Sequence, residues 1–358
     1  MKIALTFNIR HAKPSLKNRQ AIEEAEFDEP FTIRGISKAI KKLGHKVFLV
    51  EANKNAYLKF KKLKSSKQSL RDATRQAKID LVFNIAEGIS GQDREAQIPS
   101  MLEMLKIPYV GSKPLTQAIC LNKAKTKEIL LFHNIPTANF QLFKTGREKL
   151  KDNLKFPLIV KPNCEGSSKE IFQNSFVENE KDLRKKLKKI IRNLEQPALV
   201  EEFFGGREFT VSLIGNNPVE VLPPVELNFS VLPKDFIPMD SYEVKWILDN
   251  PKSKIKTIIC PAKIDEKLWQ RIKEICLKTK EVLEILDWCR IDLRLDKKGV
   301  PNVLEVNQIP GIIPDPKENS RFPLAARAAG YTFEEMLNKI IKSACKRYNI
   351  PYRRVPLC

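Results

Sequence analysis

No run of apolar residues in this sequence is long enough to cross a membrane. The 358 residues are 42% hydrophobic and 30% charged, and polar residues interrupt apolar runs such as 80–84 and 156–160. Since a spanning helix needs roughly 18 apolar residues in succession, an integral membrane protein is excluded. Residues 1–8 carry one charge and no small-residue cleavage site, so they predict a first β-strand rather than a signal peptide. The expected compartment is the cytosol.

The spacing of cysteine and histidine gives no sign of a disulfide framework or a zinc site. The seven cysteines are an odd number without any Cys-x-x-Cys spacing, and His11, His45 and His133 lie far apart. The chain also lacks a Walker loop and a Gly-x-Gly-x-x-Gly fingerprint, two common nucleotide-binding signatures.

Acidic residues are fewer than basic ones, and the excess is concentrated in two segments. The chain has 64 Lys and Arg against 43 Asp and Glu, a net charge of +21. Residues 54–78 carry nine basic residues against one acid, and residues 181–192 carry seven against one. Both segments have helical apolar spacing, so we interpret them as solvated faces of lysine-rich helices. The charge alone leaves nucleic acid as an alternative partner.

The length predicts two or three domains. In the first third, strand and helix patterns alternate, which is typical of a βαβ wound domain with a parallel sheet. The pattern predicts strands at 2–7, 46–50 and 81–84, with helices at 31–43 and 69–77. Beyond it we expect helices within 115–133, at 180–194 and at 266–283, and two more at the end of the chain. The later strands are expected at 140–143, 158–161, 198–204, 208–214, 219–225, 290–295 and 302–307, with an irregular stretch at 226–256. We place the domains at 1–112, 113–204 and 205–358.

Two late strands carry a set of polar side chains on one face. Alternate residues of a strand share a face, so Arg290 lies with Asp292, and Glu305 lies with Asn307. Oxygen ligands suit Mg²⁺, which completes its coordination with water and nucleotide phosphates, and Arg290 can stabilise an oxyanion. The alternative interpretation is a hairpin face held by salt bridges.

Two further segments have features of a nucleotide site. Residues 159–168 form a strand that carries Lys161 into a loop with Gly166, Ser167 and Ser168. Such a loop can close its N–H groups over phosphates, although a tight turn is an equally good interpretation. The strand that contains Glu201, Glu202, Phe203 and Phe204 ends at a glycine pair followed by Glu208. It could hold an adenine edge and a ribose, or be a core strand and its turn.

The order of these motifs along the chain is more specific than any one of them. They occur in the order Lys123, Lys161 with 165–168, 201–204 with Glu208, Lys245, 290–292 and 305–311. This order resembles that of the ATP-grasp carboxylate-amine ligases, specifically the D-alanine:D-alanine ligase family. The resemblance covers nearly the whole chain from about Val82, including 97–112 and 322–330. It implies that the parallel-sheet domain is followed by an ATP-grasp fold of two α+β subdomains.

The resemblance also implies roles for individual residues. Lys123 and Lys161 would hold the α- and β-phosphates of ATP, with Ser168 in the phosphate loop. Residues 201–204 would form the adenine hinge, and Glu208 would bind the ribose. Asp292, Glu305 and Asn307 would ligate two Mg²⁺ ions, with Mn²⁺ as an alternative metal. Lys245 would approach the γ-phosphate, and Ser167, Lys245 and Arg290 are the expected catalytic residues. The implied reaction phosphorylates the carboxylate of one amino acid, and the amine of a second amino acid then attacks the acyl phosphate.

The departures from the family pattern fall on substrate-facing positions. Residues 8–14 lack the glycine pair and the glutamate that would bind the first ammonium, and Glu87 could replace that glutamate. Trp246 stands where a tyrosine is usual, and Glu170 where a glycine is expected. Ser320 and Arg321 replace a serine and leucine that bind the second carboxylate. The candidate substrate residues are therefore Glu87, Trp246, Gly311, Ser320 and Arg321.

Three functions remain open from the sequence. The first is a ligase that makes D-alanyl-D-alanine or a close relative for peptidoglycan, and the second is a ligase of the same mechanism for other amino acids or peptides. The third, a basic nucleic-acid-binding protein on an inactive ligase scaffold, rests on net charge alone. We expect small amino acids as partners and no specific nucleic acid. The oligomeric state, including a homodimer, stays open.

Overall fold

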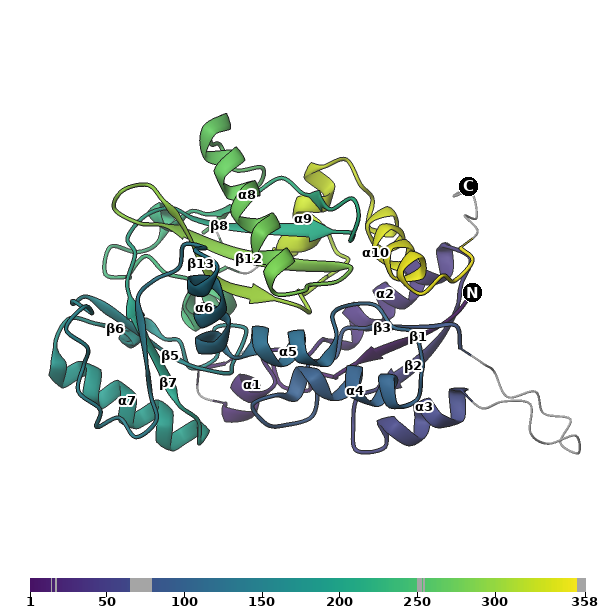
Figure 1. Ribbon diagram of the computed structural model, residues 1–358, viewed down its shortest axis with the longest axis horizontal. Coiled ribbons are helices and arrows are strands. Elements are labelled where there is room, and N and C mark those ends of the chain that lie inside the picture. Colours follow the sequence, from purple (N-terminus) through teal and green to yellow (C-terminus); the bar gives the residue numbers. More distant parts are fainter. Residues whose placement is uncertain (14, 17, 65–78, 250–252, 254, 353–358) are drawn as a thin grey trace, which may run out of the picture.

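A computed structural model describes residues 1–13, 15–16, 18–64, 79–249, 253 and 255–352, and within them the chain forms three sheets (Figure 1). The strands are β1 (Lys2–Phe7), β2 (Lys46–Glu51), β3 (Leu81–Asn84), β4 (Phe140–Phe143), β5 (Leu158–Pro162), β6 (Phe176–Val177), β7 (Ala198–Glu202), β8 (Glu208–Ile214), β9 (Glu220–Val221), β10 (Val225–Leu227), β11 (Ile258–Ile259), β12 (Trp288–Leu295) and β13 (Pro301–Asn307). The helices are α1 (Arg19–Glu23), α2 (Pro30–Lys42), α3 (Ala56–Lys64), α4 (Gln97–Met104), α5 (Pro114–Leu121), α6 (Lys123–Phe132), α7 (Glu180–Leu194), α8 (Glu266–Val282), α9 (Arg321–Ala328) and α10 (Phe333–Arg347). Short 3₁₀ turns are η1 (Arg94–Ala96), η2 (Gln173–Ser175) and η3 (Phe229–Val231), and η4 (Glu243–Leu248) is a π-helical segment.

The first sheet is parallel and has the order β2-β1-β3, which confirms the predicted βαβ winding. Alternate residues of β1 face opposite sides. Ile3 and Leu5 pack with α2 and α10, whereas Ala4 packs with α3 and α4. The helix predicted at 69–77 lies outside the described residues.

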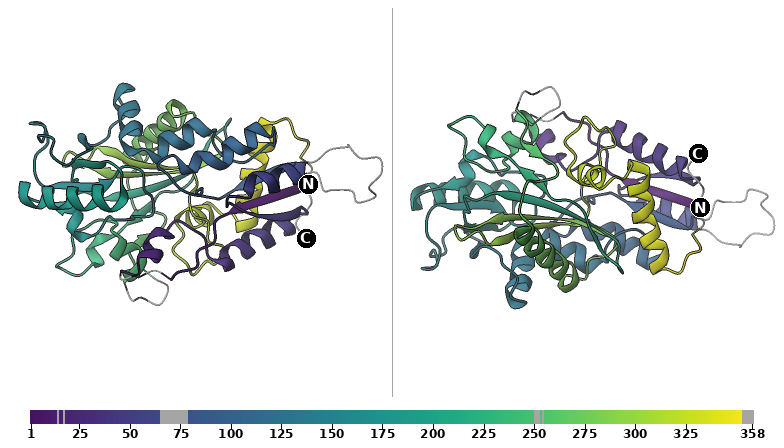
Figure 2. Two further views of the ribbon diagram at one scale, coloured as in Figure 1. Left: turned by 90° about the horizontal axis from the view of Figure 1, so that it is seen from below. Right: turned by 90° about the horizontal axis from the view of Figure 1, so that it is seen from above.

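Helix α10 covers the first sheet although it comes last in the chain. Its buried residues share one hydrophobic core with α2 and β1, and the views in Figure 2 show it beside this sheet. Lys42 of α2 forms an ion pair with Glu334 of α10 at 2.9 Å. The N-terminal sheet therefore depends on the C-terminal helix for part of its core. The domain boundaries at 112 and 204 stay predictions.

The second sheet, β4-β7-β5-β6, is antiparallel and is covered by α7. Helix α7 begins after Asn179, whose side chain accepts the N–H of Asp182 at 3.0 Å. Leu183, Leu187 and Ile190 repeat at helical spacing and are buried against the sheet. The helix predicted at 180–194 is confirmed, and most of its basic residues are exposed.

The third sheet, β11-β10-β8-β12-β13, is antiparallel, with β9 paired to β8. Helices α6 and α8 pack on it through a core that includes Leu130, Ile272 and Cys276. The continuous strand predicted at 219–225 is wrong, because the structure has only β9 and β10 there. Pro223 and Pro224 lie between them and lack the N–H groups that a strand ladder needs. Among the described residues no helix is both long and apolar enough to cross a bilayer.

Candidate active site

Two adjacent cavities bring together every residue predicted for the site. The larger cavity, about 570 Å³, lies between loops of the first sheet, the loop 166–168 (here the serine loop), η4 and the segment after β13. The smaller cavity, about 70 Å³, lies between the second and third sheets, and Glu305 lines both. The predicted residues in the larger cavity are Glu87, Lys123, Ser167, Lys245, Trp246, Arg290, Glu305, Asn307, Gly311, Ser320 and Arg321. Those in the smaller cavity are Lys161, Ser168, Glu201, Glu202, Phe203, Phe204, Glu208, Asp292 and Glu305.

The polar face predicted on β12 and β13 exists in the structure. The two strands pair antiparallel, with Arg290 opposite Asn307 and Asp292 opposite Glu305. Arg290 donates two hydrogen bonds to Asp292, from Nε at 3.0 Å and from Nη2 at 2.8 Å. The amide nitrogen of Asn307 donates to Asp292 Oδ2 at 3.1 Å, and the Thr210 hydroxyl also donates to this carboxylate. The salt bridge of the alternative interpretation is thus present together with the predicted set of oxygen ligands.

Glu305 and Lys123 join the third sheet to the start of α6. Lys123 Nζ lies 3.3 Å from Glu305 Oε2 and donates to the carbonyl oxygen of Glu165 at 2.5 Å. Burial alone would raise the pKa of Glu305, but Lys123, Arg290 and other nearby cations lower it below its usual range. Glu305 is therefore ionised at neutral pH, as a metal ligand must be.

Glu201 is held between two lysines on the floor of the smaller cavity. Its carboxylate accepts a hydrogen bond from Lys161 Nζ and lies 3.0 Å from Lys127 Nζ. Burial raises the pKa of Glu201, but the two ammonium groups outweigh it and lower the value to about 2. The Glu201 carboxylate is engaged by Lys161 and Lys127 and is not available to an adenine base. An adenine hinge at this strand would therefore use backbone N–H and C=O groups.

Glu208 and Phe203 form the other wall of the smaller cavity. Glu208 forms an ion pair with Arg294 at 3.2 Å, and the guanidinium of Arg294 lies 4.8 Å from the centre of the Phe203 ring. Burial raises the pKa of Glu208 to about 7, although Arg294 opposes the shift. Phe203 also makes an edge contact with Phe176 at 4.9 Å, so its ring is fixed from two sides.

The serine loop and η4 close over the larger cavity. Ser167 and Ser168 have φ values of 51° and 57°, in the left-handed region that L-residues seldom adopt. Trp246 Nε1 donates to the Ser167 carbonyl oxygen at 3.0 Å, and Ser168 Oγ donates to the Asp240 carbonyl oxygen at 2.7 Å. Burial lowers the pKa of Lys245 to about 8, with Arg321 and Arg290 acting in the same direction and Asp240 against it.

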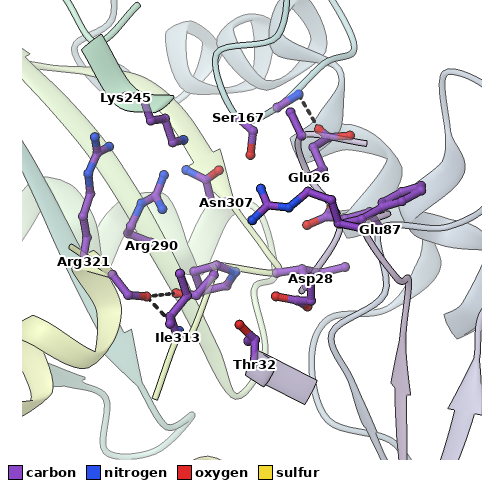
Figure 3. A pocket seen from close by; sticks show the side chains of 18 of the residues that line it. Glu26, Asp28, Thr32, Glu87, Ser167, Lys245, Arg290, Asn307, Ile313 and Arg321 are labelled. Carbon is purple, nitrogen blue, oxygen red and sulfur yellow. Dashed lines mark hydrogen bonds between the residues drawn. The ribbon is translucent and has the colours of Figure 1, made fainter. Parts of the chain in front are cut away.

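Ser320 and Arg321 have their polar groups engaged within the protein. The Ser320 hydroxyl accepts the N–H of Ile313 at 3.0 Å and donates to the Gly311 carbonyl oxygen at 3.0 Å. Arg321 donates to Asp240 Oδ2 at 2.8 Å, and Figure 3 shows it beside Arg290 and Lys245. The predicted grip of Arg321 on a substrate carboxylate therefore stays a prediction, in which the free edge of the guanidinium would act.

Comparisons with known proteins agree with this geometry. Residues 129–342 match the family model for the D-ala D-ala ligase C-terminus. An uncharacterized protein of Sinorhizobium fredii is 35% identical over 87% of this chain and 86% of its own length. A D-alanine--D-alanine ligase of Pelotomaculum thermopropionicum is 33% identical over 78% of this chain and 84% of its own length. The chain belongs to the D-alanine:D-alanine ligase family.

Solved structures show the same fold over nearly the whole length of this ligase-family chain. A D-alanine--D-alanine ligase of Bacillus anthracis complexed with ATP is 21% identical, with a TM-score of 0.69, and covers 98% of this chain and 99% of its own. The VanG D-Ala:D-Ser ligase of Enterococcus faecalis is 22% identical, with a TM-score of 0.70, and covers 96% of this chain and 99% of its own. The predicted ATP-grasp fold is confirmed.

The donor set of this ligase fits Mg²⁺ only together with a nucleotide. Among the described residues, no group of three or more His, Cys, Asp or Glu side chains could hold a metal ion. Asp292, Glu305 and Asn307 would supply two carboxylates and one amide oxygen, and phosphate oxygens and water would supply the remaining ligands. The residues present therefore fit a metal that arrives with ATP.

The larger cavity has an acidic wall formed by Glu26, Asp28, Glu87 and Glu95, of which the sequence indicated only Glu87. Glu26 accepts hydrogen bonds from Arg94 at 2.9 and 2.6 Å and from the Gly166 N–H at 2.6 Å. A Cβ at Gly166 would clash with Glu26 Oε1, so a side chain at this position would displace the carboxylate. Glu26 and Asp28 lie well beyond residues 8–14, the loop in which the ammonium-binding acid was sought. Lys127 was also missed, although its position one helical turn after Lys123 could have indicated it.

Proposed function

We propose that this ligase uses ATP and Mg²⁺ to join the carboxylate of one amino acid to the amine of another through an acyl phosphate. D-alanyl-D-alanine or a close relative for peptidoglycan is the first candidate product. The observation that carries the proposal is the convergence of Lys123, Arg290 and Glu305 at the junction of the two cavities. We further propose that it is a cytoplasmic enzyme.

The smaller cavity would hold the nucleoside of ATP. Phe203 and the backbone of 201–204 would contact the base, and Glu208 would accept a ribose hydroxyl. Lys161, held in place by Glu201, would point its charge toward the phosphates. With the serine loop above it, such a cradle binds phosphate through backbone N–H groups and fixed positive charge.

The junction would position the reacting groups. Bound Mg²⁺ would neutralise phosphate charge, and Asp292, Glu305 and Asn307 would hold it there. Lys245, whose pKa is lowered to about 8, would still be mostly protonated at neutral pH and would stabilise charge on the γ-phosphate. Arg290, oriented by its two hydrogen bonds to Asp292, would stabilise the tetrahedral oxyanion. In the described residues the site shows no nucleophile paired with a base, which suits direct transfer without a covalent enzyme intermediate.

A second candidate is a ligase of the same mechanism for a different pair of amino acids or for peptides. The acidic wall formed by Glu26, Asp28, Glu87 and Glu95 favours this candidate. Alanine has a single ammonium group, which needs fewer carboxylates than the four that this wall supplies.

The test is ADP and phosphate release measured for purified protein with ATP, Mg²⁺ and a matrix of D- and L-amino acid pairs. We expect release that depends on both amino acids, together with a dipeptide of the same pair. D-alanine as the best substrate would support the first candidate, and any other pair would support the second. Release that no amino acid stimulates would contradict both.

A further inference from the structure

One end of the larger cavity carries more acid than its cations balance. Five carboxylates gather there, and they come from three separate segments: Glu26, Asp28, Glu87, Glu95 and Glu165. Figure 3 shows Glu26, Asp28 and Glu87 on the opposite side of the cavity from Lys245 and Arg321. Arg94 and Lys169 are the cations paired with this group, at 2.6 to 3.1 Å. Three carboxyl groups are left without a cationic partner.

Those three carboxyl groups are Asp28, Glu87 and Glu95. Within the described part of the chain, none of these side chains forms a hydrogen bond or an ion pair, whereas both oxygens of Glu26 are engaged by Arg94. Glu95 is only 9% exposed and faces the cavity. Glu95 is the buried member of the three, and Asp28 and Glu87 are half-buried beside it. A buried carboxylate is normally paired, so Glu95 without a partner at the cavity wall indicates a cationic occupant.

Two cations near this end of the cavity are engaged by other acids. Arg10 pairs with Glu29 at 2.7 Å, and Lys123 pairs with Glu305 at 3.3 Å. Lys13 is exposed at the rim. Neither Arg10 nor Lys123 forms an ion pair with Asp28, Glu87 or Glu95.

The electrostatics favour a cation beside these three carboxyl groups. Burial and then the neighbouring Glu95 and Glu26 raise the pKa of Glu87 well above its usual range. Burial, followed by Glu26, raises the pKa of Glu95 to about 8, and burial raises the pKa of Asp28 to about 7. A positive charge between them would return all three to the ionised form.

The occupant is not expected to be a metal ion. No group of three acids, histidines or cysteines in the described residues is arranged to hold one. Carboxylates that surround a cavity without converging on one point suit a ligand with spaced ammonium groups instead.

We propose that the first-substrate subsite takes a diamino carboxylic acid, with Asp28, Glu87 and Glu95 binding its two ammonium groups. This inference rests on the proposed ligase function and names the substrate class of the same site. The substrate carboxylate then lies toward Arg290 and Lys245, where it is phosphorylated, while the side-chain amine lies at the acidic end. Alanine leaves at least one of these carboxylates without a partner, so it is the poorer substrate.

The test compares diamino acids with isosteres that lack the second amine. ATP-dependent ADP release is measured for lysine against norleucine and for ornithine against norvaline, each as D- and L-forms, with alanine as the second substrate. We expect kcat/KM for a diamino acid to exceed that of its isostere by at least about tenfold, since a site built for N–H donors rejects analogues without them.

Variants localise the effect. Glu95→Gln and Glu87→Gln should each reduce the preference for the diamino acid over its isostere by about tenfold. The matched control is Glu23→Gln, which removes an exposed acid of the neighbouring helix that pairs with Arg19 at 2.7 Å, and it should keep the preference. Calorimetric binding of lysine and norleucine to the wild-type protein with ADP and Mg²⁺ gives the same comparison if a variant fails to fold.

The outcomes separate the two proposals. A preference for norleucine, norvaline or alanine, with ADP release intact, would overturn the diamino-acid inference and leave the ligase function standing. Preference for a diamino acid that survives in both cavity variants would overturn the assignment to this wall. Absence of ADP release with every amino acid would contradict the ligase function itself.

Discussion

Replacing Glu305 by glutamine removes one negative charge from the junction of the two cavities and keeps the size of the side chain. In the wild-type protein this carboxylate faces Lys123 at 3.3 Å and lies opposite Asp292 across the strand pair. If it ligates Mg²⁺, the variant loses several kcal/mol of transition-state charge stabilisation. At about 1.4 kcal/mol per tenfold in rate, kcat should fall by roughly two to three orders of magnitude.

The same change should cost little stability. The Glu305 side chain is 28% exposed, and Lys123 keeps its hydrogen bond to the Glu165 carbonyl oxygen at 2.5 Å. We expect a loss of about 1 to 2 kcal/mol in the free energy of unfolding, the usual value of one partly exposed charged contact. Loss of activity and loss of stability are therefore separable.

The assay is steady-state ADP release at saturating ATP and amino acids, with thermal unfolding of the same preparations. Glu128→Gln is the matched control, because it removes an exposed carboxylate of α6 that pairs with Lys125 at 2.6 Å. The control should keep wild-type turnover. Near-normal turnover of Glu305→Gln, or a loss no larger than its unfolded fraction, would refute the metal assignment.

Three further predictions follow from individual contacts. Glu201→Gln leaves Lys127 and Lys161 buried beside a neutral group, so urea unfolding should show a loss of about 3 to 5 kcal/mol at pH 7. Because the pKa of Glu201 is lowered to about 2, the contribution of this carboxylate is complete above pH 4.5 and is lost as the pH falls toward 2, so the difference from wild type should shrink over that range. Trp246→Phe removes the hydrogen bond to the Ser167 carbonyl oxygen, worth about 1 kcal/mol, and should raise KM for ATP by roughly fivefold; an unchanged KM would show that this contact does not hold the serine loop closed over ATP. Arg321→Leu breaks the ion pair with Asp240 and removes a positive charge from the larger cavity. Competition between second substrates should therefore shift toward small ones such as D-alanine. An unaltered substrate profile would count against Arg321 as a specificity residue.

Local periodicity predicted the parts of the site that depend on neighbouring residues. Alternation in β12 and β13 placed Arg290 with Asp292 and Glu305 with Asn307 on one face, and the strand register confirms this. Helix α7 was predictable because apolar residues repeat at helical spacing along 181–192. Where local chemistry was overlooked, as at the two prolines between β9 and β10, the predicted strand was wrong.

The acidic wall was beyond the reach of such patterns. Glu26, Glu87 and Glu165 lie close together because the segments after β1 and β3 face the loop after β5. The spacing of these residues in the sequence does not indicate this contact. Glu201 shows the same limit in another way. Its position on a strand was predictable, but its two lysine partners come from α6 and β5. The family resemblance indicated which residues line the site, but only the structure showed which side chains they contact.

Transfer of oxygen from the first amino acid to phosphate tests the central claim most directly. The claim is that the carboxylate attacks the γ-phosphate of ATP and that the second amine then displaces phosphate from the acyl phosphate. With the first amino acid labelled by ¹⁸O in its carboxylate, each dipeptide formed should release one phosphate that carries one labelled oxygen. Phosphate released without label, while the dipeptide forms, would contradict the acyl-phosphate route and with it the proposed function.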